Sequence, residues 1–107
     1  MTRTLVVDEA AQDEAEAQAA YYVEHAGTAI ALAFVTELEA IFRGLIEGRL
    51  VGVNHPRVTS RVPVKRVYFD RFPYAVVFFI EGEAVHVVAV EALRRRPGYW
   101  RSRITKR

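Results

Sequence analysis

The sequence predicts an α+β protein in which an N-terminal strand and an antiparallel helical hairpin pack on one face of a mainly antiparallel sheet. Three observations support this fold class: amphipathic helical periodicity in residues 9–47, apolar strand-like segments in residues 62–92, and the separation of the two along the chain. Helices grouped before hairpin-connected strands are typical of α+β proteins. We expect about three to four strands, and a single domain over residues 1–107.

The first half of the chain predicts two helices joined by a short turn. The first runs from Glu9 to His25, can be capped by Asp8 and stops at Gly27, whereas the second runs from Thr28 to Glu47 and ends at Gly48. Each helix has an expected inner face, made of Ala11, Ala15, Ala19, Tyr22 and Ala26 in the first and of Ile30, Phe34, Leu38, Ile41 and Leu45 in the second. Such amphipathic faces and a short joint indicate an antiparallel hairpin.

The strands are expected around this hairpin. They are placed at residues 5–7, 62–69, 74–80 and 84–92, with a turn at 70–72 and a loop over 49–61. Tyr74 to Ile80 is apolar throughout, which indicates burial on both faces and therefore a central position in the sheet. With the hairpin on one face, we expect the other face to be partly open and to carry some of the basic residues.

The charge of the chain is distributed unevenly. Residues 1–50 carry a net charge of −6 and residues 51–107 a net charge of +8, within an overall +2. The basic character is densest directly after the last predicted strand, where the candidate binding residues are Arg94, Arg95, Arg96, Tyr99, Trp100 and Arg101. This segment indicates a surface that holds a nucleic acid or an acidic partner. Trp100 either anchors that interface or packs the C-terminal segment on the sheet, and both interpretations stay open.

Several kinds of chemistry lack their sequence signals. The chain has no cysteine, no glycine-rich phosphate loop and no serine triad, so we expect no metal site and no cofactor. His25, His55 and His86 are far apart in the sequence, and none is expected to form a functional pair. No apolar run approaches the length of a membrane helix, and no signal peptide is evident. We therefore expect a cytoplasmic protein that does not engage a membrane.

The order of the elements, together with short motifs, resembles the RelE/ParE family of type II toxin–antitoxin toxins. The motifs are the opening strand and acidic helix over 5–22, the helix over 31–39, Arg71-Phe-Pro-Tyr74, the strand over 84–90 and Arg94-Arg-Arg-Pro-Gly-Tyr-Trp-Arg101. The resemblance implies a small toxin that a cognate antitoxin neutralises, within toxin–antitoxin assemblies that can be larger than a pair.

The resemblance leaves two toxin activities to distinguish, ribosome-dependent mRNA cleavage as in RelE and inhibition of DNA gyrase as in ParE. RelE-like nucleases use lysines, arginines and a tyrosine; if this chain is a nuclease, the resemblance implies Arg66, Arg95 and Tyr99 as catalytic residues. The tyrosine position aligns with Arg101, near Tyr99, and Ala75 occupies a position at which such nucleases carry an arginine. Alanine neither transfers a proton nor neutralises charge, which weakens the nuclease interpretation.

The favoured hypothesis is therefore a ParE-like toxin, similar to plasmid-stabilisation proteins, which inhibits growth by poisoning DNA gyrase through binding alone. The alternatives are a metal-independent endoribonuclease that acts on ribosome-bound mRNA, and an antitoxin-binding module without toxicity of its own. Arg95→Glu is expected to weaken antitoxin binding or toxicity if the basic cluster is functional.

Overall fold

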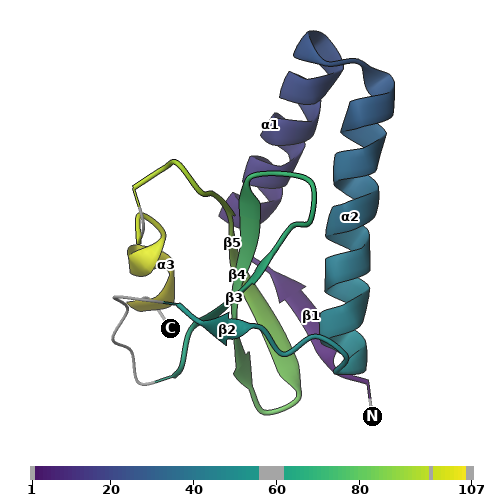
Figure 1. Ribbon diagram of the computed structural model, residues 1–107. Coiled ribbons are helices and arrows are strands. Elements are labelled where there is room, and N and C mark those ends of the chain that lie inside the picture. The colour runs from purple at the N-terminus through teal and green to yellow at the C-terminus, as the bar shows by residue number, and fades with distance from the viewer. Residues whose placement is uncertain (1, 56–61, 97, 106–107) are drawn as a thin grey trace.

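The computed structural model describes residues 2–55, 62–96 and 98–105 of the chain, in which a helical hairpin and a short C-terminal helix lie on opposite sides of one sheet (Figure 1). The elements in chain order are β1 (Thr4–Val7), α1 (Glu9–His25), α2 (Thr28–Glu47), β2 (Val53–Asn54), β3 (Lys65–Tyr68), β4 (Tyr74–Glu81), β5 (Ala84–Ala92) and α3 (Arg101–Thr105). This arrangement confirms the predicted α+β class.

The sheet has five strands in the order β1-β5-β4-β3-β2. β4 is central, as predicted, and its residues from Tyr74 to Phe79 are buried. The pairings among β2, β3, β4 and β5 are antiparallel, whereas β1 lies parallel to β5 with Thr4 opposite Ala84. A parallel pair needs a crossover connection, and the α1–α2 hairpin is part of the long chain segment between these two strands.

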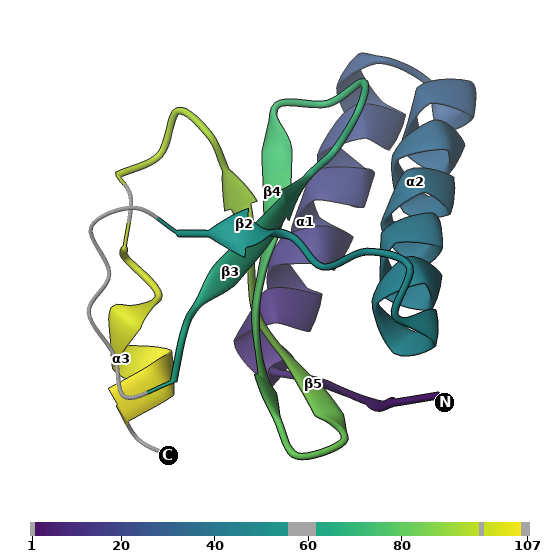
Figure 2. The same ribbon diagram turned by 60° about the horizontal axis from the view of Figure 1, so that its bottom comes forward.

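The hairpin covers one face of the sheet, and the two helices run side by side along it (Figure 2). Phe34 is fully buried and its ring stacks on that of Phe69 at a centroid distance of 5.1 Å. Leu38, Ile41 and Leu45 continue the buried stripe of α2, and Ala11 is fully buried on α1. These residues match the predicted amphipathic faces and belong to the core cluster that packs the hairpin against the sheet.

The tip of the hairpin departs from the predicted faces. Ile30 is 42% exposed and Ala26 is exposed, although both were expected to face inward. Figure 1 shows the α1–α2 junction projecting beyond the end of the sheet, so the periodic pattern continues where no strand lies beneath it. At the start of α1, Asp8 occupies the N-cap position but its side chain makes no capping hydrogen bond, contrary to expectation.

The second half of the chain differs from the prediction at its edges. Residues 49–61 were expected to form a loop, but they contain the two-residue strand β2; residues 56–61 lie outside the described part. The strand expected over 62–69 is limited to β3, because Pro63 cannot donate to a ladder. The turn at 70–72 is confirmed, and Glu37 of α2 accepts hydrogen bonds from the backbone N–H groups of Asp70 and Arg71.

Candidate functional site

The C-terminal segment covers the face of the sheet that the hairpin leaves free. Trp100 is fully buried there, in an apolar cluster with Val64, Val77, Phe79, Val88 and Ala89. The expectation of a partly open second face is therefore wrong for this part of the sheet. Of the two interpretations of Trp100, packing of the tail matches the structure, and its indole does not contribute to the exposed surface.

A buried carboxylate organises this second face. Nε2 of His55 lies 3.2 Å from both carboxylate oxygens of Glu91, and the indole N–H of Trp100 donates to Oε2 at 2.7 Å. Arg66 approaches Glu91 at 3.6 Å and its guanidinium lies over the ring of Tyr68. Since carboxylate oxygens accept, Nε2 of His55 carries the hydrogen. Glu91 thus joins the segment after β2, strand β3 and the C-terminal segment.

Sequence spacing suggested no partner for His55, and the structure supplies one in Glu91, as a contact within the fold. Its partner Glu91 is 36 residues away in the sequence, so spacing carries no signal of the pair. The only signal is one acidic residue within the strand Ala84–Ala92, which is apolar apart from this residue and His86; the acidic position proves buried. Buried charges in proteins are paired, so this single glutamate predicts a basic partner without identifying it.

A second carboxylate, Glu14 on α1, holds the other side of the C-terminal segment. β1 pairs with β5 only as far as Val87, and beyond this point the N–H of Val90 donates to Glu14 at 3.1 Å. Tyr99 donates its hydroxyl to Glu14 at 2.7 Å, and Arg103 donates through both terminal nitrogens at 3.1 Å. Glu14 and Arg103, which sequence reasoning did not select, therefore close the open edge of β5 and fix the last turn of the chain.

Three of the predicted basic residues lie on the loop between β5 and α3, and the fourth, Arg101, is the first residue of α3. Arg94, Arg95, Arg96 and Arg101 are all open to solvent, while Tyr99 is half-buried among them. The guanidinium of Arg95 lies 3.7 Å from the centre of the Tyr99 ring and 3.8 Å from a Glu14 oxygen. The structure thus leaves four of the predicted binding residues exposed, on a segment that Trp100 and Glu14 attach to the sheet.

The residues implied for a nuclease are engaged in other contacts. Arg66 is mostly buried and paired with Glu91, and Ala75 is fully buried directly opposite Glu91 in the β4–β5 register. Burial, followed by the hydrogen bond to Glu14, raises the pKa of Tyr99 well above its usual range. The phenol therefore stays protonated at neutral pH and donates to Glu14, which makes it unsuitable as a general base.

Neither a metal site nor a membrane span is found among the described residues. Within residues 2–55, 62–96 and 98–105, no three His, Asp or Glu side chains gather in a way that could hold a metal ion. No helix in the same part of the chain combines the length and the apolar character that crossing a membrane requires.

Comparisons with known proteins place the fold. No protein-family model matches the sequence, and no curated protein matches it significantly. Among solved structures, a chain described as "Chromosomal ParDE TA system from P. aeruginosa" superposes with a TM-score of 0.68 at 20% sequence identity, covering 87% of this chain and 98% of that one. The molecule is thus a small α+β protein with a helical hairpin on one face of its sheet and a basic C-terminal segment on the other. It has a RelE/ParE-like fold, which confirms the resemblance noted in the sequence.

Proposed function

We propose that this chain is the toxin of a type II toxin–antitoxin module and that it acts as ParE-like toxins do, by binding and poisoning DNA gyrase in the cytoplasm. The proposal is supported by the likeness of the fold to a chain from a ParDE toxin–antitoxin system. A cognate antitoxin is the second partner under this proposal, and it neutralises the toxin in a pair or a larger assembly.

One observation carries the choice of a binding activity over RNA cleavage. Metal-free cleavage needs a base for the ribose hydroxyl and an acid for the leaving oxygen, both within reach of the substrate. Here Tyr99 is bonded to Glu14, Arg66 is paired with Glu91, and Ala75 offers no functional group. The positions implied for proton transfer are thus committed to holding the fold, whereas the arginines that follow β5 are exposed to solvent.

The surface that we propose for this binding consists of Arg94, Arg95, Arg96 and Arg101, with Tyr99 beside them. Guanidinium groups pair with carboxylates in a bidentate geometry and stack on aromatic rings, which suits an acidic protein segment. Because the loop rests on the buried Trp100, the surface is presented in a defined orientation, which lowers the cost of ordering it on binding.

The test is a gyrase cleavage assay with supercoiled plasmid and antitoxin-free chain. Accumulation of linear, protein-linked DNA that depends on both gyrase and the chain is the expected result. Arg95→Glu is expected to reduce this product by roughly tenfold, the effect of losing a charged interface contact of about 1.4 kcal/mol. Arg43→Glu makes the same charge change at an exposed position of α2 and is expected to leave the product unchanged.

Other outcomes separate the alternatives. If folded protein leaves supercoiling unchanged but cleaves transcripts on ribosomes, the chain is a ribosome-dependent endoribonuclease and the gyrase proposal fails. If induced cells grow normally while the chain still captures its antitoxin, the chain is a binding module. Because Arg95 also contacts Tyr99 and Glu14, thermal unfolding of each variant must accompany the assay.

A further inference from the structure

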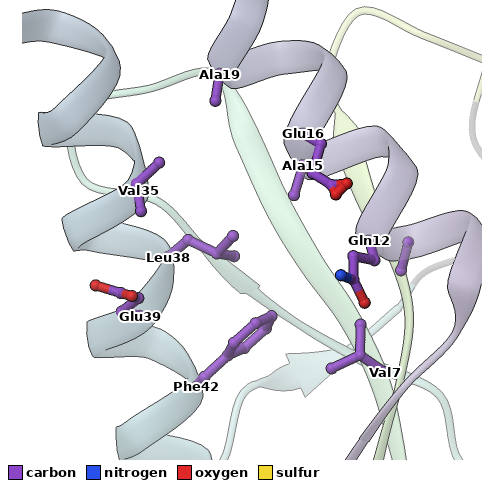
Figure 3. A pocket seen from close by; sticks show the side chains of 10 residues that line it. Val7, Gln12, Ala15, Glu16, Ala19, Val35, Leu38, Glu39 and Phe42 are labelled. Atoms are coloured by element: carbon purple, nitrogen blue, oxygen red, sulfur yellow. The ribbon is translucent and has the colours of Figure 1, made fainter. Parts of the chain in front are cut away.

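Helix α2 borders a cavity on each of its two flanks. Figure 3 shows the groove between α1 and α2, in which Val35 and Phe42 belong to an apolar wall. The other cavity lies on the far flank of α2, between this helix, strand β3 and residues 49–50, and has a volume of about 240 Å³. This second cavity, the α2–β3 pocket, combines an aliphatic surface with charged residues at its margin, so it can hold a ligand that has both kinds of group.

The floor of the α2–β3 pocket is aliphatic. Ile41 of α2 is 6% exposed, and Leu50 and Val67 beside it are partly buried. Along α2 the lining runs from Glu37 to Ile41, which is one helical turn or roughly 6 Å. This floor suits a short alkyl chain such as the four-carbon stem of lysine, whose methylene groups lie along apolar surface while the charged end stays near water.

Two acidic residues line the pocket beside the turn at 70–72. Oε1 of Glu37 accepts hydrogen bonds from the backbone N–H groups of Asp70 and Arg71, whereas the nearest cation to Oε2 is Nε of Arg71 at 3.8 Å, beyond hydrogen-bonding distance. Asp70 is exposed, and within residues 2–55, 62–96 and 98–105 its carboxylate has no ion-pair partner. These carboxylate oxygens can therefore still accept from a cation that brings several N–H donors.

The neighbouring arginines do not neutralise this part of the pocket. Arg49 lines the pocket, but its Nη2 and Nε lie 2.6 Å and 2.7 Å from Oε1 of Glu47. Arg66 of β3 is directed to Glu91, on the opposite face of the sheet. An anionic ligand would have to separate Arg49 from Glu47, whereas a cationic ligand meets the two acidic residues directly. The electrostatics of the pocket therefore favour a cation.

We propose that the α2–β3 pocket binds a primary alkylammonium group, with the carbon chain on Ile41, Leu50 and Val67 and the ammonium beside Glu37 and Asp70. A primary ammonium supplies three N–H donors on a compact charge. Two sources carry this chemistry, the lysine side chain of a protein partner and a free polyamine. The pocket is separate from the basic C-terminal segment, and the proposal requires neither toxicity nor gyrase.

Chemical shifts of the backbone amides test the proposal on the full, ¹⁵N-labelled chain, because Ala40, Leu50 and Asp70 each report on the pocket through their own N–H. The probes are n-butylammonium and 1-butanol, which has the same carbon chain and no charge. We expect n-butylammonium to give saturable shifts that are confined to the residues of the pocket. We expect 1-butanol to bind roughly tenfold more weakly, because it forms no ion pair with the carboxylates.

Matched variants locate the binding site. Ala40→Leu places a larger side chain in the pocket and is expected to weaken binding of n-butylammonium at least tenfold, whereas Ala20→Leu makes the same change at an exposed position of α1 and is expected to leave it unchanged. Asp70→Asn is expected to weaken binding roughly threefold to tenfold, against no change for Asp13→Asn at another exposed position of α1.

Two further ligands distinguish the sources of the ammonium group. A blocked tripeptide with a central lysine represents a protein partner, and spermidine represents a free polyamine. Tighter binding of the tripeptide assigns the pocket to a lysine side chain, tighter binding of spermidine assigns it to a polyamine, and either result supports the proposal. Equal binding of n-butylammonium and 1-butanol, unchanged binding by the Ala40→Leu variant, or shifts spread over the acidic residues of α1 instead of the pocket would each overturn it.

Discussion

Replacing Glu91 with leucine tests whether the buried carboxylate holds the second face of the sheet together. Glu91 is 2% exposed and accepts from His55 and Trp100, while Arg66 lies 3.6 Å away with a buried Nε that has no hydrogen-bond partner in the described structure. Removing one member of a buried ion pair typically costs about 3–5 kcal/mol, because its partners lose their compensation. A domain of this size has a total stability of about 5–15 kcal/mol, so the loss is a large fraction of it.

Urea unfolding gives this free energy directly, and the chain contains its own reporter. Trp100 is the only tryptophan of the sequence and is fully buried against Glu91, so its emission follows the contact itself. Glu81→Leu, at an exposed position of β4, is the matched control and is expected to change the unfolding free energy by less than about 0.5 kcal/mol. A loss below about 1 kcal/mol for Glu91→Leu would refute the argument, because it would mean that the carboxylate contributes little beyond its own cost of burial.

Three further changes probe the remaining features. Glu14→Ala removes the acceptor that binds Val90 and Tyr99, and is expected to cost about 2–4 kcal/mol in urea unfolding, against less than about 0.5 kcal/mol for Glu16→Ala. Gly48→Ala places a side chain at a φ of 77°, and is expected to lower stability by about 1 kcal/mol in the same measurement. Folding raises the pKa of the Tyr99 phenol. The neutral phenol therefore stabilises the folded state fully at any pH below its unfolded pKa of about 10. This stabilisation declines as pH rises through the folded pKa. Tyr99→Phe should therefore flatten the fall in urea midpoint above that pH, and an unchanged slope would contradict the hydrogen bond to Glu14.

Local sequence patterns predicted correctly those elements whose ends are marked by residues within the element itself. The bounds of α1 and the end of α2 agree with the prediction, because periodic apolar residues and Gly48 mark them within the segment itself. The central place of β4 also follows from its unbroken apolar run. The two-residue strand β2 and the helix α3 carry no such pattern, since they exist only through contacts with β3 and with the second face of the sheet.

The same distinction applies to the candidate site, in which some residues could be selected from local sequence patterns and others could not. The arginines after β5 could be selected from the sequence, because a run of charge at the end of an apolar strand is a local signal. The pairing of His55 with Glu91 and the contacts of Glu14 with Tyr99 join residues 36 and 85 positions apart.

The sequence by itself thus determined the class of fold, the helices and the location of positive charge, all of which depend on short-range periodicity and composition. Only the tertiary structure decided which of these charges are held in the fold and which remain exposed. The reason is that a carboxylate selects its partners by distance in space, and folding brings them from elements that are remote in the chain.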